Sequence, residues 1–98
     1  MYRQGDITLT KIDKLPKGAK KLNHKIVARG EATGHSHRFE DNATELYLLN
    51  GLMYINVPFT TEIIHDEHNP IEIGEGVYEV GNEREYDYAK EEVERVLD

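Results

Sequence analysis

The sequence feature that most constrains the fold is a pair of apolar and β-branched runs joined by an Asn-Gly dipeptide. The runs span Glu45–Leu49 and Leu52–Val57, with Asn50 and Gly51 between them. Asn and Gly both adopt positive φ, which a type I′ turn requires at its two central positions, and the twist of this turn matches a two-residue hairpin. Pro58 follows directly, and proline cannot donate a hydrogen bond to a ladder. The sequence therefore predicts an antiparallel hairpin that ends before Pro58.

Most of the remaining chain alternates apolar and polar residues with a period of two, which is typical of half-buried strands. Residues 15–19 are predicted to form a turn or loop, and the spacing of apolar residues becomes helical from about Ala89 to Leu97. Further strands are predicted at Asp6–Ile12, Lys25–Arg29, Glu62–His65, Ile71–Ile73, Gly76–Val80 and Arg84–Tyr88. We therefore expect one mainly β domain over residues 1–98, a small antiparallel barrel or sandwich with one short C-terminal helix.

The composition excludes several classes of protein. At 98 residues and 38% hydrophobic content, the chain has enough residues for one domain with a lean core. No apolar run approaches the roughly 20 residues of a membrane span, and the first ten residues lack the apolar segment of a secretory signal. The absence of cysteine excludes disulfides, thiolate metal sites and cysteine nucleophiles. We expect a cytoplasmic protein with no membrane partner, whose chemistry comes from histidines, carboxylates and hydroxyls.

Charge is distributed unevenly along the chain. The net charge is −7, but residues 1–30 carry eight Lys and Arg against two Asp, whereas residues 31–98 carry four against seventeen acids. So acidic a chain is a poor non-specific binder of nucleic acid, because affinity for phosphates scales with the cations available. The basic run from Lys11 to Arg29 is either a patch for an anionic ligand or, as we favour, a solvated loop and edge strand where lysine discourages edge pairing.

Four of the five histidines occur as two close pairs, which are the strongest functional signal in the sequence. The pairs are His35 with His37 and His65 with His68. In an extended strand, residues i and i+2 point the same way, so His35 and His37 can present two imidazoles to one point. If the second pair ends a strand of the same sheet or its partner, at least one of its rings faces the first pair. The pattern predicts a shared site, whereas His24 is expected to be a surface residue.

Four imidazoles, or three and a carboxylate, are suited to a divalent transition metal such as Zn, Fe, Mn or Ni. Asp66 and Glu67, inside the second pair, can each orient an imidazole or serve as a base. A second interpretation is a metal-independent ribonuclease or phosphodiesterase. Its clustered histidines would act as general acid and base, and Arg38, Arg84 or the basic run would hold phosphate. A third is a non-catalytic binding module. RNA or a small anionic ligand is a candidate partner, and the oligomeric state, including a homo-oligomer, is left open.

Around the first histidine pair the chain resembles the cupin superfamily of small β-barrels. The matching order is a glycine, a His-x-His, a glutamate three residues on and a later glycine, here Gly30, His35, His37, Glu40 and Gly51. The resemblance implies that His35, His37 and Glu40 are metal ligands on a jelly-roll-like barrel. It covers only residues 30–51, because the second histidine pair precedes the Pro-containing and Gly-containing turns, whereas cupins place it after them.

A second resemblance spans most of the chain. The segments that carry it are residues 3–6 (RQGD), 30–38 (GEATGHSHR), 65–71 (HDEHNPI), 76–80 (GVYEV) and 84–86 (REY). They are similar to a family of short hypothetical proteins from phage and bacterial genomes. This resemblance implies that both histidine pairs and the last segment belong to one unit. Arg84 is then a candidate anchor for an anion or carboxylate, and Tyr86 a candidate hydroxyl donor, although Tyr86 is also suited to half-buried packing in a sheet.

Overall fold

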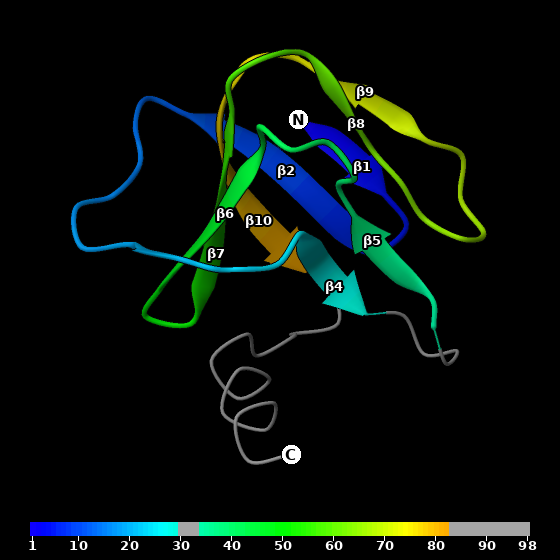
Figure 1. Ribbon diagram of the computed structural model, residues 1–98, viewed down its shortest axis with the longest axis horizontal. Coiled ribbons are helices and arrows are strands. Elements are labelled where there is room, and N and C mark those ends of the chain that lie inside the picture. Colours follow the sequence, from blue (N-terminus) through cyan, green and yellow to red (C-terminus); the bar gives the residue numbers. More distant parts are fainter. Residues whose placement is uncertain (30–33, 83–98) are drawn as a thin grey trace.

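The computed structural model describes residues 1–29 and 34–82 of the chain. All strand pairs within this part are antiparallel, and they form one six-stranded sheet in the order β1-β2-β10-β7-β6-β3 and two hairpins, β4-β5 and β8-β9 (Figure 1). The strands are β1 Tyr2–Gln4, β2 Ile7–Ile12, β3 Lys20–Lys21, β4 Ile26–Arg29, β5 Ser36–Arg38, β6 Glu45–Leu49, β7 Leu52–Val57, β8 Thr61–Ile63, β9 Ile71–Ile73 and β10 Gly76–Asn82. The prediction of a mainly β fold is confirmed.

The predicted central hairpin is present. Strands β6 and β7 pair from Glu45 opposite Asn56 to Leu49 opposite Leu52. Asn50 has φ of 51° and Gly51 has φ of 79°, so both central residues of the turn have the positive φ that a type I′ turn needs. Strand β7 ends at Val57, directly before Pro58, as predicted.

Other strands agree with the sequence except at the second histidine pair. The predicted strand Glu62–His65 is displaced: β8 ends at Ile63, Ile64 forms an isolated bridge with Arg38, and His65 lies outside any strand. Strand β10 continues to Asn82, two residues beyond the prediction. The short edge strands β1 and β3 were not predicted. The predicted strand Arg84–Tyr88 and helix Ala89–Leu97 lie outside the described residues.

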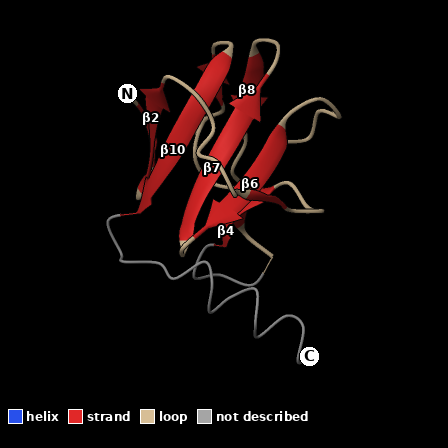
Figure 2. Ribbon diagram, turned by 90° about the vertical axis from the view of Figure 1, so that its left-hand side faces the viewer, coloured by secondary structure: helices blue, strands red, loops and turns tan. Residues whose placement is uncertain are grey.

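The core lies between one face of the sheet and the two hairpins. Tyr78, Ile55 and Leu46 stand side by side across β10, β7 and β6 and are at most 2% exposed. Their cluster also contains Val27, Ala28, Phe39, Ile63 and Ile73, which come from the hairpins and the segments next to them. Figure 2 shows β2, β10, β7 and β6 side by side. Burial of apolar surface from both layers is what fixes the hairpins on the sheet.

Of the two expected architectures, a barrel or a sandwich, the described strands do not form a closed barrel. The six-stranded sheet ends at β1 and β3, and these two end strands are not paired with each other. Both are too short, at three and two residues, to continue a ladder around a barrel. Lys20 and Lys21 make up β3, and Lys21 pairs with Glu45 of β6 at 2.7 Å. Within the described ranges there is no helix with the length and hydropathy needed to cross a membrane.

Candidate histidine site

Two backbone hydrogen bonds bring the histidine pairs together. The N–H of Arg38 donates to the Ile64 carbonyl oxygen at 2.9 Å, and the N–H of Ile64 donates to the Arg38 carbonyl oxygen at 2.8 Å. Strand β5 carries His37 and begins just after His35, and His65 directly follows Ile64. The bridge between β5 and the end of β8 therefore places both pairs at one edge of the hairpin layer, which is the layer formed by β4-β5 and β8-β9.

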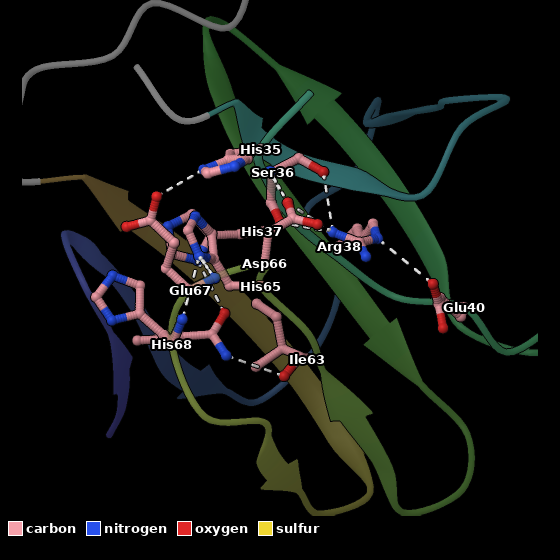
Figure 3. A network of polar contacts seen from close by, with 11 residues as sticks. His35, Ser36, His37, Arg38, Glu40, Ile63, His65, Asp66, Glu67 and His68 are labelled. Atoms are coloured by element: carbon pink, nitrogen blue, oxygen red, sulfur yellow. Dashed lines mark hydrogen bonds and ion pairs between the residues drawn. The ribbon is translucent and has the colours of Figure 1, made fainter. Parts of the chain in front are cut away.

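The four imidazole rings form one cluster, as predicted (Figure 3). His65 lies at its centre, with its ring centroid 4.3 Å from that of His37, 4.8 Å from that of His68 and 6.1 Å from that of His35. The rings of His37 and His68 are nearly parallel, at 14°, with centroids 6.0 Å apart. The predicted approach of His35 and His37 to the second pair is therefore confirmed. Their roles as ligands or catalysts stay predictions.

His37 is the buried member of the cluster, and its partner is Gln4. The His37 side of β5 faces the core, and this residue is only 6% exposed. Its Nδ1 lies 2.8 Å from Oε1 of Gln4. Gln4, at the end of β1, is paired with buried Ile7, so both side chains point to the core face of the sheet. Sequence reasoning missed Gln4 as a site residue.

His65 is oriented by backbone groups of its own loop. Its Nδ1 accepts hydrogen bonds from the N–H of Glu67 at 3.0 Å and from the N–H of His68 at 3.4 Å. An Nδ1 that accepts carries no proton, so the neutral ring has its proton on Nε2. Burial lowers the pKa of His65 below its usual 6.5, and the neighbouring His68 lowers it further. His65 is therefore neutral at pH 7.

The two carboxylates between His65 and His68, those of Asp66 and Glu67, contact strand β5 and the residue before it. Oε1 of Glu67 lies 2.8 Å from Nδ1 of His35, whose side chain is 32% exposed. Oδ2 of Asp66 accepts from the Ser36 N–H at 2.9 Å and from Nη1 of Arg38 at 3.2 Å. The Ser36 hydrogen bond and the Arg38 charge lower the pKa of Asp66, so its carboxylate stays ionised. The loop thus orients His35 and binds β5, and neither carboxylate is bonded to His65 or His68 in these contacts.

A glycine in the β1–β2 turn makes room for two of the rings. Gly5 has φ of +58°, and a Cβ at this position would lie 2.8 Å from Nε2 of His68 and 3.4 Å from Cε1 of His37. The turn Gly5-Asp6 joins β1 to β2 with Gln4 opposite Ile7. Gly5 was also missed, although a Gly-Asp dipeptide between two β-like runs is a hairpin signal.

Other predicted site residues lie apart from the rings or outside the described chain. Nε of Arg38 pairs with Oε2 of Glu40 at 3.4 Å, and Figure 3 shows Glu40 beyond Arg38, away from the histidines. Arg38 itself is engaged by Asp66, Glu40 and the Ser36 carbonyl oxygen. His24 lies before β4, where its Nδ1 accepts from the Ile26 N–H at 3.2 Å. Arg84 and Tyr86 lie outside the described residues.

Three of the imidazole rings are spaced about as far apart as the ligands of one metal ion. With metal–nitrogen distances near 2.1 Å, a ligating imidazole has its centroid about 3.2 Å from the ion, so two ligands at a tetrahedral angle have centroids about 5 Å apart. The three distances among His37, His65 and His68 are 4.3, 4.8 and 6.0 Å. Nevertheless, no group of three or more donor side chains in the described ranges is already arranged to hold an ion. An ion would therefore be bound only after these side chains move.

The fold and the site define a small mainly β domain with a histidine cluster at the edge of its hairpin layer. The chain belongs to the family described as Domain of unknown function (DUF8820), which matches residues 3–83. That range includes both histidine pairs together with Gln4, Gly5, Asp66 and Glu67. No curated protein and no solved structure matches the chain.

Proposed function

We propose that this protein binds a divalent transition metal ion, Zn, Fe, Mn or Ni, with donors drawn from His35, His37, His65 and His68. The observation that carries the proposal is the convergence of four imidazoles from two distant segments, with neighbouring centroids 4.3 to 6.1 Å apart. Histidine is the commonest metal ligand in proteins, and its imidazole is suited to Zn, Fe and Ni in particular. Glu40, which the cupin resemblance implied, is omitted because it pairs with Arg38 away from the rings.

The polar contacts around the rings support this proposal. Metal-bound histidines usually give their second ring nitrogen to a carboxylate or a carbonyl oxygen, which fixes the direction of the first. His35 has such a contact with Glu67, and His37 has one with Gln4. The lowered pKa of His65 adds a neutral ring, and only a neutral imidazole can bind a cation.

The four histidines are not equally ready to bind. Gln4 and Glu67 engage His37 and His35 through Nδ1, an arrangement that is compatible with metal ligation through Nε2. Ligation through Nε2 of His65 would move its proton to Nδ1 and break both backbone hydrogen bonds. We therefore expect His37 to contribute most to affinity and His65 to bind only with a change in the loop 65–68.

The test uses full-length protein without a histidine tag, stripped with chelator and titrated calorimetrically with Zn²⁺, Ni²⁺ and Mn²⁺. Elemental analysis after desalting gives the stoichiometry. We expect one ion per chain, strong loss of binding in His37→Ala, and wild-type binding in His24→Ala, which removes a histidine outside the cluster. Absence of binding for every metal, or equal binding by both variants, would refute the proposal.

A second candidate, acid–base catalysis without metal, is favoured by one specific observation. His65 carries its proton on Nε2, and the neighbouring ring of His37, 4.3 Å away between centroids, has its Nδ1 engaged by Gln4. Cleavage of a phosphodiester such as RNA requires a neutral imidazole as the base and a protonated imidazole as the acid, so one of the two rings would take up a proton to act as the acid. Cleavage of RNA in excess EDTA that is lost in both His37→Ala and His65→Ala would establish this function. If the protein neither binds metal nor cleaves RNA, the third interpretation is favoured, a non-catalytic accessory module of phage or bacterial origin.

A further inference from the structure

We propose that Gln4 is the positioning residue of the histidine site, because its one amide fixes the proton of His37 and also holds both ends of the loop that carries His65 and His68. The effect of Gln4 on metal affinity rests on the proposed metal-binding function. Its effects on the proton of His37 and on the loop concern the metal-free protein. Gln4 would touch no ion or substrate and would act through the histidines.

The contacts of the Gln4 amide determine its orientation. Nε2 donates to the carbonyl oxygens of Ile63 at 3.1 Å and Asn69 at 2.9 Å, and Oε1 lies 2.8 Å from Nδ1 of His37. An amide nitrogen has two hydrogens, and both are used by these two carbonyls. A flipped amide would set its oxygen against two carbonyl oxygens, so the hydrogen-bond pattern allows one orientation.

The proton on His37 follows from this orientation. Because Oε1 can only accept, Nδ1 of His37 must be the donor in the 2.8 Å contact. The neutral ring then has its lone pair on Nε2. This is the form in which an imidazole binds a metal through Nε2, so Gln4 prepares His37 before any ion arrives.

The same amide controls the position of the second pair. Ile63 is the last residue of β8, and Asn69 follows His68, so the two carbonyls that Gln4 holds flank residues 64–68, which include the loop 65–68. Gln4 is 4% exposed, which shields these hydrogen bonds from water. Loss of the amide would release the loop at both ends and leave two carbonyl oxygens without this donor.

Two substitutions separate the two actions of the amide. Gln4→Met keeps similar length and removes every hydrogen bond. Gln4→Glu keeps an acceptor for His37 but places carboxylate oxygens against the carbonyls of Ile63 and Asn69. Tyr78→Phe is the matched control, since Tyr78 is 2% exposed and its hydroxyl donates to the Gly74 carbonyl oxygen at 2.7 Å, without contact to the histidines.

The first measurement is long-range ¹H–¹⁵N NMR of the imidazoles in metal-free protein, which distinguishes protonated from unprotonated ring nitrogens. Wild type and Tyr78→Phe should show Nδ1–H for His37. Gln4→Met should show a mixture of the two tautomers, whereas Gln4→Glu should keep Nδ1–H and shift the signals of His65 and His68. If Gln4→Met leaves all these signals unchanged while folding normally, the inference is overturned.

The second measurement is Zn²⁺ affinity of the same variants, each checked for folding by circular dichroism. Loss of a partner that orients a ligand usually reduces metal affinity 10- to 100-fold, so we expect about this reduction for Gln4→Met and less than about threefold for Tyr78→Phe. Equal reduction in both variants would overturn the positioning role. If wild type binds no ion but the tautomer of His37 depends on Gln4, the inference stands and the metal-binding proposal fails.

Discussion

The substitution Gly5→Ala tests how closely the β1–β2 turn is fitted to the histidines. Gly5 has φ of +58°, a left-handed conformation that costs a residue with a Cβ about 1–2 kcal/mol. The added Cβ would also lie 2.8 Å from Nε2 of His68, which is closer than van der Waals contact allows. Its distance to Cε1 of His37 would be 3.4 Å, and His37 is too buried to move freely. His68 is exposed, so it is the ring that must move.

Gly51→Ala is the matched control for backbone strain. Gly51 also lies in a two-residue hairpin turn, with φ of +79°, but a Cβ there meets nothing within 4 Å. Both variants should lose about 1–2 kcal/mol of unfolding free energy, because the contact at Gly5 is relieved by an exposed side chain. Only Gly5→Ala should separate the rings of His37 and His68.

Urea unfolding gives the stability of the two variants, and Zn²⁺ calorimetry gives their affinity. We expect a tenfold or greater loss of affinity in Gly5→Ala, on the scale that a disturbed ligand environment produces, and wild-type affinity in Gly51→Ala. Nuclear Overhauser contacts between the His37 and His68 rings should be lost in Gly5→Ala alone. Equal affinities in the two variants would refute the fit described for this turn.

Three further predictions concern stability and protonation. Leu46→Ala removes a fully buried side chain, so urea unfolding should show a loss of about 2–5 kcal/mol in the free energy of unfolding. The metal stoichiometry of the folded protein should not change. A loss below about 1 kcal/mol would contradict the assignment of Leu46 to the core. Partial burial acts to raise the pKa of Asp41, but hydrogen bonds from Thr61, Thr44 and Ala43 outweigh it and lower the pKa from 3.8 to about 2. Because the folded pKa is below the unfolded one, about 2 kcal/mol of stability should be present above about pH 4 and lost as the pH falls through about 2. Unfolding measured against pH should show this loss in wild type and not in Asp41→Ala. Burial and the neighbouring His68 lower the pKa of His65. Metal-free protein should therefore lose stability as the pH falls from 6.5 through that lower pKa. An NMR titration that places the pKa of His65 at or above 6.5 would contradict this prediction.

The sequence was informative where local rules determine the structure. Asn50-Gly51 and the alternation around it specify a hairpin without help from distant residues, and the structure has that hairpin. The i, i+2 spacing of His35 and His37 predicted two rings on one side of a strand; both rings lie near His65, although His35 itself precedes β5. Their approach to the second pair depended only on the two strands being neighbours, and the Arg38–Ile64 bridge makes them so.

The contacts that orient the rings could not be predicted in the same way. Gln4 lies on a three-residue edge strand, too short to show a period, and its burial depends on a loop about 60 residues later. The carboxylate of Glu67 contacts His35, while its backbone N–H donates to Nδ1 of His65 in a tight turn that the sequence does not report. The barrel expectation failed for a related reason, since closure depends on pairing between end strands that sequence patterns do not report.

X-ray absorption at the zinc edge is the most direct test of a shared histidine site, because it counts imidazole ligands and needs no assay of activity. The tag-free protein is loaded with one equivalent of Zn²⁺ and compared with His37→Ala and His24→Ala. We predict at least three nitrogen ligands near 2.0–2.1 Å with imidazole scattering in wild type and in His24→Ala, and loss of this signal in His37→Ala, which binds the ion poorly. A spectrum dominated by oxygen ligands, with at most one imidazole, would contradict a shared histidine site.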